Sequence, residues 1–193
     1  MYNVNEWLCF TDALDKKTCK KLIKLGKEKW TSGGTKSKKQ RYKRVSDIVW
    51  INDQWIYNTI WPYMEQANEE AGWKYDIRAA EQMQITRYKK GGFYYFHKDG
   101  KGDHLSTYDE PDNEFMHGYV RKLSMTVLLN DNYGGGEFQF ASLDQEECTI
   151  ETPEFNKIGS IIVFPSDMEH RVTPVTKGIR YSLVVWFLGP PFK

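Results

Sequence analysis

The sequence has few cysteines and no long apolar run, and each shortage excludes a class of protein. Cys9, Cys19 and Cys148 are odd in number and show no C-x-x-C spacing, so neither a disulfide framework nor a thiolate zinc site is encoded. No stretch approaches the roughly 18 apolar residues of a membrane span, and the first residues lack the basic and apolar regions of a signal peptide. We therefore expect a soluble, cytoplasmic protein with no membrane partner.

Aromatic residues, by contrast, are plentiful. Ten Phe, seven Trp and twelve Tyr make up 15% of the 193 residues, which is more than a disordered chain carries. A chain of this length can bury a core without disulfides. We expect a single domain with a helical lead-in over residues 1–79 that packs on a β-rich core over residues 80–193.

Positive charge is concentrated in one segment. Residues 16–44 hold 13 Lys and Arg against the single acid Glu28, whereas residues 45–193 hold 14 bases against 22 acids. Such a stretch can attract nucleic acid or an acidic partner. We favour the simpler interpretation, an exposed lysine face on an amphipathic helix followed by a flexible basic loop over residues 31–44.

Two helices are predicted in the lead-in. The first covers residues 15–29, where Asp15 can cap and the apolar residues fall on one side. Asp53 opens the second, which reaches about Ala71 and contains Pro62, a residue type that can kink a helix.

After Trp73 the pattern changes to short apolar runs between turn residues, which predicts strands. They cover residues 80–88, 93–97, 121–129, 137–140, 147–151, 160–164, 169–174 and 179–188. Eight strands are typical of a jelly roll. The long polar insertion 100–118 suggests a functional loop or lid. Glycines 134–136 predict a turn between strands, because no Gly-Lys-Ser follows them as it would in a phosphate-binding loop.

Two of the four histidines occur where their side chains and a carboxylate can meet. His97 and Asp99 are two residues apart at the end of an aromatic strand, so both side chains point to one face. His170 follows another apolar strand and a Pro-Ser turn. Two imidazoles and one carboxylate suit Fe(II) in oxygenases. The H-x-D pair alone is equally well an ordinary capped or salt-bridged strand end.

Arg180 strengthens the metal hypothesis. It enters the last apolar strand ten residues after His170, and an antiparallel return brings it beside that histidine. A buried guanidinium needs an anion, which a dicarboxylate cosubstrate would supply, and Ser182 on the same face can add a hydrogen bond. The alternative is a structural ion pair with an acid of the protein.

These motifs resemble the prolyl 4-hydroxylase-like branch of the 2-oxoglutarate- and Fe(II)-dependent dioxygenases over about residues 80–188. The family's tyrosine, glycine and aromatic residue ahead of H-x-D correspond to Tyr88, Gly91 or Gly92, Phe93, His97 and Asp99. Its R-x-L strand and G-G-E segment correspond to Arg121, Leu123, Leu129, Asn130, Gly135, Gly136, Glu137, Phe138 and Phe140. Its closing pattern corresponds to residues 164–166, His170, Val172, Pro174, Val175, Gly178, Arg180 and Trp186.

The resemblance implies a mainly β fold, a double-stranded β-helix (a cupin-like jelly roll) with N-terminal α-helices. It further implies that His97, Asp99 and His170 bind Fe(II) and that Arg180 holds the far carboxylate of 2-oxoglutarate. The implied reaction consumes O2, converts 2-oxoglutarate to succinate and hydroxylates a C–H bond of the substrate, with ascorbate as a candidate stimulant.

The resemblance also implies which side chains line the cosubstrate pocket. These are Tyr88, Ser182 and Trp186, although Trp186 is equally well a core aromatic. Where some relatives place a Tyr as a second carboxylate partner, this chain has Val127 and Leu128. Ser182 or Thr126 can compensate.

The implied substrate is a prolyl residue in a peptide or protein. A free amino acid or another small molecule is the alternative, and a catalytically silent cupin-like binding module is the alternative from outside the enzymes. Nucleic-acid dealkylation is disfavoured, because that branch has a second arginine six residues past the first and this chain has Trp186 there. His104 and His117 are expected to be solvated loop residues.

Overall fold

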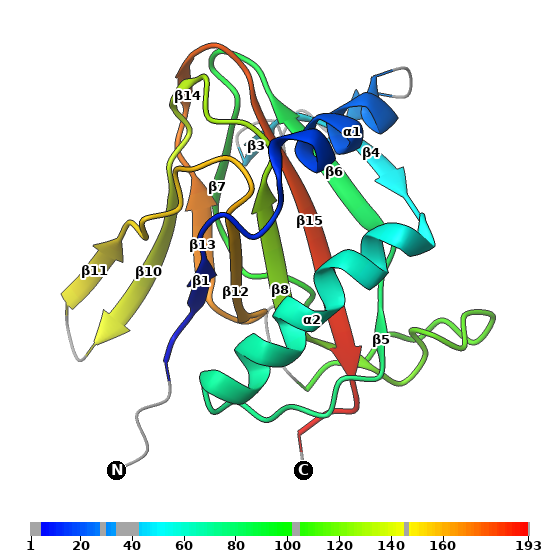
Figure 1. The fold of residues 1–193 in the computed structure, drawn as a ribbon. Helices are drawn as coiled ribbons and strands as arrows, with labels where there is room; N and C mark the ends of the chain where they lie inside the picture. Colours follow the sequence, from blue (N-terminus) through cyan, green and yellow to red (C-terminus); the bar gives the residue numbers. More distant parts are fainter. Residues whose placement is uncertain (1–4, 28–29, 34–42, 102–104, 145–146, 193) are drawn as a thin grey trace.

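The computed structural model describes residues 5–27, 30–33, 43–101, 105–144 and 147–192. Two antiparallel sheets form the body, and two helices lie on one side of the larger sheet (Figure 1). In these ranges no helix is both long enough and apolar enough to cross a membrane.

The larger sheet contains the strands that are most deeply buried. Within the described ranges its order is β1-β12-β8-β15-β6-β4-β2, with β5 paired to β15. In that order its strands are Leu8–Phe10, Ile161–Pro165, Val120–Leu128, Arg180–Gly189, Met83–Tyr88, Asp47–Ile51, Thr31–Ser32 and, for β5, Ala79–Ala80. The central strands β12, β8 and β15 are buried along most of their length on both faces. β12 and most of β15 are apolar accordingly, whereas β8 also contains Lys122, Ser124 and Thr126.

The smaller sheet contains the two strands in which His97 and His170 lie. Its order is β11-β10-β13-β7-β3, and its strands are Glu147–Glu151, Phe138–Asp144, Glu169–Val172, Phe93–His97 and Arg44–Val45. β9 (Gly134–Gly135) and β14 (Val175–Lys177) pair with each other as a separate two-stranded sheet. In Figure 1, β14 lies above the smaller sheet.

Helix α2 (Gln54–Glu70) lies across the larger sheet. Ile56, Ile60 and Met64 recur every fourth residue and are buried, so the helix presents one apolar face to the sheet. It begins after Asp53, as the sequence predicted, and runs on through Pro62.

Helix α1 (Lys16–Gly26) is amphipathic, as the sequence predicted, and ends a turn earlier than expected. The Asp15 carboxylate accepts a 2.6 Å hydrogen bond from the backbone N–H of Thr18, which caps the helix. Cys19 and Leu22 are buried. The exposed face consists of Lys16, Lys17, Lys20, Lys21 and Lys24.

Two hydrophobic clusters fill the fold. The larger one lies between the helices and the larger sheet, and includes Ile56, Leu123 and Leu183. The second is aromatic and lies around the histidines, with Phe138, Phe140 and Phe164 in contact. Burying each such side chain stabilises the fold by about 1.5–3 kcal/mol.

All eight predicted strands are present, within a few residues at their ends. The lead-in differs from the sequence-based expectation, because four strands, β1 to β4, accompany its two helices and join the sheets. At the two ends of the segment 31–44, for which the sequence predicts a flexible loop, β2 and β3 pair with neighbouring strands. Residues 34–42 lie outside the described part.

In the insertion 100–118, the described residues 105–118 form hydrogen-bonded structure. Tyr108 and His117 form a β-bridge, and the N–H of Tyr108 donates to the carbonyl of Tyr119 at 2.9 Å. A turn closes its tip, where the N–H of Asn113 donates to the carbonyl of Glu110 at 2.9 Å. The segment therefore projects from the body as a hydrogen-bonded hairpin-like arm (Figure 1).

Candidate metal centre

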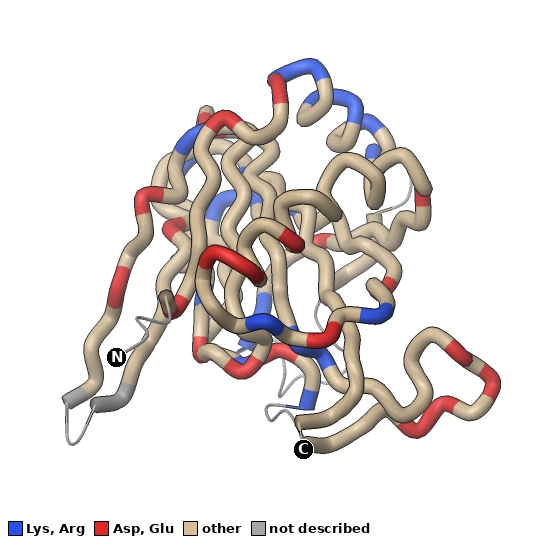
Figure 2. Tube along the Cα trace, turned by 60° about the horizontal axis from the view of Figure 1, so that its bottom comes forward, with Lys and Arg blue, Asp and Glu red and all other residues tan. Residues whose placement is uncertain are grey.

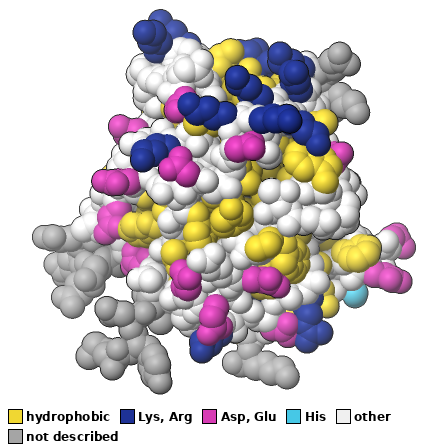
Figure 3. Space-filling view, in the orientation of Figure 1, with side chains coloured by type: hydrophobic (Ala, Val, Ile, Leu, Met, Phe, Trp, Pro, Cys, Tyr) yellow, Lys and Arg dark blue, Asp and Glu magenta, His cyan; other side chains and the backbone are white. Residues whose placement is uncertain are grey.

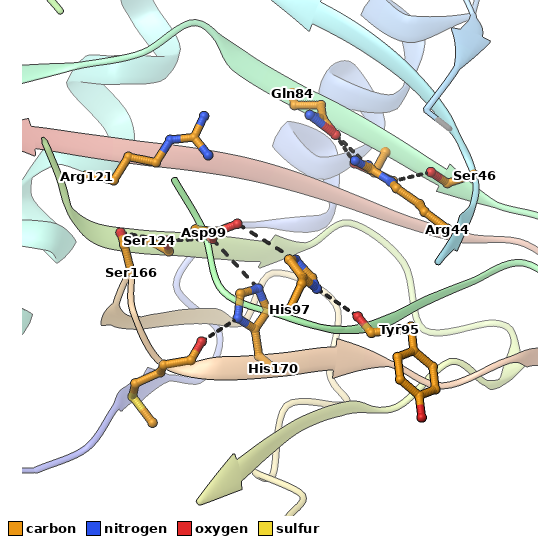
Figure 4. A network of polar contacts seen from close by, with 12 residues as sticks. Arg44, Ser46, Gln84, Tyr95, His97, Asp99, Arg121, Ser124, Ser166 and His170 are labelled. Carbon is orange, nitrogen blue, oxygen red and sulfur yellow. Dashed lines mark hydrogen bonds and ion pairs between the residues drawn. The ribbon is translucent and has the colours of Figure 1, made fainter. Parts of the chain in front are cut away.

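The two predicted histidines face each other across a strand pair. β13 pairs with β7, and His170 is the register partner of His97. Asp99 follows β7 by two residues, so its carboxylate reaches the same point (Figure 4). One ligand atom from each of His97, Asp99 and His170 lies within 4.8 Å of the others, and one metal ion placed between them can contact all three.

Backbone carbonyls fix the orientation of both rings. Nδ1 of His97 lies 2.8 Å from the carbonyl oxygen of Tyr95, and Nδ1 of His170 lies 2.9 Å from that of Met168. A carbonyl only accepts, so each Nδ1 carries a proton, and in the neutral ring Nε2 then has the lone pair. The two Nε2 atoms lie 3.8 and 3.7 Å from the oxygens of Asp99, which is the arrangement of atoms that a metal requires.

Two serines hold the carboxylate. The hydroxyl of Ser124 on β8 donates to Oδ2 of Asp99 at 2.7 Å, and it lies 2.9 Å from the hydroxyl of Ser166. The backbone N–H of Asp99 donates to the carbonyl of Ser166 at 2.9 Å. Both serines are buried, so the position of Asp99 is set by the protein without help from water.

The electrostatics of the three groups favour a cation. Burial lowers the pKa of His97 to about 3, and the neighbouring His170 adds to the effect, so the ring is neutral at pH 7 and can donate a lone pair. Burial alone would raise the pKa of Asp99, but interactions with His170, His97 and Arg121 and the hydrogen bond from Ser124 lower it. The effects of Arg121 and Ser124 persist when both imidazoles are neutral.

Arg180 lies in the same cavity as the triad and is 1% exposed. Its Nη1 donates to the hydroxyl of Ser182 at 3.1 Å, whereas Nε and Nη2 have no hydrogen-bond partner among the described residues. No carboxylate in the described part of the chain lies within ion-pairing distance of it. The structural ion pair that the sequence left open is therefore absent from these residues, and two N–H-bearing atoms of the buried guanidinium have no acceptor among them.

Every cosubstrate residue suggested by the sequence lines this one cavity. Tyr88 on β6 is the register partner of Arg180, and the guanidinium lies 5.6 Å from its ring centre. The others are Ser182, Thr126 and Trp186. Trp186 is buried and also lines the cavity. Its indole N–H has no hydrogen-bond partner among the described residues.

Of the other two histidines, only His117 is among the described residues, and it is not part of the triad. His117 is in the arm, where its ring is about half exposed and lies 3.9 Å from the exposed Asp109. His104 is outside the described residues.

Some lining residues were not found from the sequence. Arg44 on β3 donates to Gln84 at 2.6 Å and to Ser46 at 2.8 Å (Figure 4), and its guanidinium lies 4.6 Å from the ring centre of Tyr94. Tyr94 in turn stacks on His97 at 3.5 Å between ring centres. The sequence does contain a signal for Gln84. Gln84 and Thr86 are polar residues two positions apart in a buried strand, so they lie on one face of it, and buried polar side chains on one face indicate a polar site there.

A third arginine, Arg121, does not line the cavity but contacts the lining residue Trp186. Arg121 makes two hydrogen bonds of 2.6 Å with the carboxylate of Glu81, and its guanidinium lies 4.1 Å from the ring centre of Trp186. This bidentate pair braces Trp186 from outside.

Known proteins resemble this chain in sequence and in fold. A PKHD-type hydroxylase of Synechococcus sp. (strain CC9902) is 35% identical over 112 residues, which are 57% of this chain and 42% of that protein. The chain thus matches less than half of the length of this curated relative.

Solved structures match over nearly their whole length. A Pseudomonas putida prolyl-4-hydroxylase superposes with a TM-score of 0.67 and 19% identity, over 94% of this chain and 91% of that one. A viral collagen prolyl hydroxylase from Paramecium Bursaria Chlorella virus-1, in its 2OG complex, gives 0.68 and 21% identity, over 96% and 97%. At these identities the likeness shows the fold, a jelly roll of the kind that the sequence predicted.

The family model described as the 2OG-Fe(II) oxygenase superfamily matches residues 83–188, more than half of the chain. That range begins with β6 and ends in β15, so it contains His97, Asp99, His170 and Arg180. On this match, the chain belongs to the 2OG-Fe(II) oxygenase superfamily.

Proposed function

We propose that this protein is a 2-oxoglutarate- and Fe(II)-dependent dioxygenase that hydroxylates a prolyl residue of a polypeptide. The observation that carries the proposal is the presence, in one cavity, of the His97, Asp99 and His170 ligand set and of a buried arginine with unused donors. The described residues provide no ion-pair partner for Arg180, and they bring three potential metal ligands to one point.

The donor set fits iron. Two neutral imidazole nitrogens and one carboxylate oxygen on one side of an ion leave its other positions open, an arrangement typical of non-haem Fe(II) oxygenases. Bound there together, Fe(II) and 2-oxoglutarate supply the activation of O2, with decarboxylation of 2-oxoglutarate to succinate. Ser124 keeps Asp99 in place, and the carbonyls of Tyr95 and Met168 keep both rings in place.

Arg180 and Ser182 fit the far carboxylate of 2-oxoglutarate. A carboxylate accepts two parallel hydrogen bonds from a guanidinium, and Arg180 has two buried N–H-bearing atoms without a partner in the described chain.

The names of relatives support a prolyl residue as the target. Two of the structural neighbours are a prolyl-4-hydroxylase and a collagen prolyl hydroxylase, and a third is a prolyl hydroxylase in complex with a peptide fragment of hypoxia inducible factor. Tyr94 and Trp186 line the cavity here, and their rings offer flat apolar surface to a pyrrolidine ring.

The test is turnover by the full chain. The protein is loaded anaerobically with Fe(II), mixed with 2-oxoglutarate and ascorbate, and screened with proline-containing peptides and with free amino acids under 18O2. We expect succinate and a peptide product heavier by one 18O atom in equal amounts. Product from free amino acids alone would reassign the substrate, and absence of succinate with every candidate would favour a silent binding module.

A further inference from the structure

A second hollow lies beside the catalytic cavity. This groove has a volume of about 900 Å3 and is bounded by β4, β5, the first half of α2 and residues 113–116 of the arm. Its lining is rich in aromatic side chains, including Trp50, Tyr57, Trp61 and Phe115. A volume of this size is in the upper part of the range for ligand pockets, and far exceeds what one free amino acid occupies.

Large apolar side chains of the groove face solvent. Trp50 is 46% exposed and Phe115 is 73% exposed, and Phe115 is the most exposed of the large apolar side chains described. The groove also contains Met116. Apolar surface that is contiguous and rimmed by polar residues is typical of a site that binds another molecule.

The arm gives the groove a negative rim. Residues 105–118 contain Asp109, Glu110, Asp112 and Glu114 but no Lys or Arg, and all four acids are exposed. Figure 2 shows acidic positions along the projecting arm, and Figure 3 shows acidic side chains at its tip next to hydrophobic ones. The basic α1 lies at the opposite end of the molecule in both views.

No cation of the groove lining balances this charge. Arg78, which lines the groove, has its guanidinium bound to both oxygens of Asp76 at 2.6 and 2.8 Å. Glu81 also lines the groove, but its carboxylate is bound to Arg121. Lys101 donates to the carbonyl of Thr107 in the arm at 2.6 Å, but the four acids of the arm outnumber this one base, and an excess of acids attracts cations and repels phosphate groups.

The groove and the catalytic cavity share a wall. The rings of Trp50, in the groove, and Trp186, in the cavity, are 5.9 Å apart between centres. On the other side, Glu81 in the groove binds Arg121, whose guanidinium lies against Trp186. An extended chain advances about 3.3–3.6 Å per residue, so a residue in the groove is only a few positions from one in the cavity.

We propose that this groove binds a basic and apolar segment of the polypeptide substrate, within a few residues of the hydroxylated position. The aromatic lining receives an apolar side chain of that segment, and the acids of the arm pair with its Lys or Arg residues. The inference rests on the proposed function and specifies its substrate class, a cationic polypeptide. Nucleic acid does not fit, because the rim repels phosphate.

Peptide binding tests the groove directly. Three labelled decapeptides share a central proline and one leucine and differ only in three positions, which are Lys, Gln or Glu. Their binding to the Mn(II)- and 2-oxoglutarate-loaded protein is measured by fluorescence anisotropy. We expect the Lys peptide to bind about tenfold more tightly than the Gln peptide, as two or three exposed ion pairs would give, and this preference to fall with added salt.

Matched variants locate the effect. The double variant Asp112→Asn/Glu114→Gln should remove most of the preference for Lys, whereas Glu69→Gln/Glu70→Gln, an equal loss of charge at the far end of α2, should preserve it. Phe115→Ala should weaken all three peptides alike. Its side chain is mostly exposed, so the variant is expected to fold. Equal affinity of the three peptides, or an unchanged preference in the arm variant, would overturn the proposal.

The outcome is separable from that of the proposed function. Substrate-independent succinate formation and 2-oxoglutarate binding report on the triad and Arg180, and should be the same in the arm variant and in wild type. A Lys peptide that binds without being hydroxylated would leave the groove intact and refute the prolyl target. Hydroxylation with the same Michaelis constant for all three peptides would refute the groove and leave the chemistry intact.

Discussion

The hydroxyl of Ser124 lies 2.7 Å from Oδ2 of Asp99 and is its only side-chain hydrogen-bond partner among the described residues. Ser124 lies in the middle of β8, on a strand that contains none of the three triad residues. It is fully buried, so no water can take over the hydrogen bond without displacing packed side chains. The carboxylate of the metal site is thus held from the larger sheet, while both imidazoles come from the smaller one.

Ser124→Ala should weaken metal binding more than it weakens the fold. Loss of a group that orients a metal ligand typically reduces metal affinity by about 10- to 100-fold, and we expect that range for Mn(II), measured from the free-ion signal in electron paramagnetic resonance. Ser160→Ala is the control, because Ser160 is equally buried and its hydroxyl has no partner in the described chain. Equal Mn(II) affinity in both variants would contradict the positioning role.

The triad itself makes a sharper prediction. His97→Ala, Asp99→Ala and His170→Ala should each abolish iron-dependent succinate formation, because each removes one of three ligands that lie within 4.8 Å. Circular dichroism should show folded proteins, since most of the apolar core lies on the far side of the larger sheet. His117→Ala, in the arm, should retain metal affinity. Wild-type oxygen consumption in any triad variant would refute the assignment.

The sequence predicted the long strands well, because each has an apolar run bounded by turn residues. It missed the short ones. β1 has three residues and β2, β3 and β5 have two each, too few for an alternating pattern to be visible. Their position depends on pairing with strands that are distant in the sequence, as Leu8 pairs with Val163, and local residue preferences do not encode such pairing.

The site was predictable where its residues occur in a recognisable spacing. His97, Asp99, His170 and Arg180 each follow or begin a predicted strand, and the register of β7 with β13 then brings the histidines together. Ser124 and Ser166 are neither charged nor in a distinctive motif. Their hydroxyls meet at 2.9 Å only because β8 and β12 pair in one register, which the sequence does not reveal.

The ion pairs of Asp47 lead to a prediction for the stability of the protein at acid pH. Its carboxylate on β4 accepts hydrogen bonds of 3.0 and 2.7 Å from Arg87 on β6 and lies 3.2 Å from Lys89. Burial alone would raise the pKa of Asp47, but these two cations hold it below the ordinary value of 3.8. As the pH falls, the unfolded chain binds the proton first, so the stabilisation is complete above about pH 5 and is lost below the ordinary pKa.

We therefore expect Asp47→Asn to lower the free energy of unfolding at pH 7 by about 0.5–1 kcal/mol, the range of a partly exposed ion pair. The difference from wild type should shrink between pH 5 and pH 3, as measured by urea denaturation. In an Arg87→Gln background the same substitution should have less effect, because its main partner is gone. A difference that is constant over this pH range would show that the carboxylate charge is not the cause.

Arg180 should discriminate the cosubstrate. A guanidinium offers two parallel donors to a carboxylate and an ammonium only a point charge, so Arg180→Lys should raise the Michaelis constant for 2-oxoglutarate more than it lowers the turnover number. Arg180→Ala should raise it further, by about ten- to a hundredfold, as expected for loss of a charge-assisted contact of about 1.5–3 kcal/mol. Mn(II) affinity should be the same in wild type and both variants, because the side chain is not among the three metal-ligating residues. The measurement is 2-oxoglutarate saturation at fixed iron, and an unchanged Michaelis constant in Arg180→Ala would mean that the buried donors of Arg180 serve a different anion.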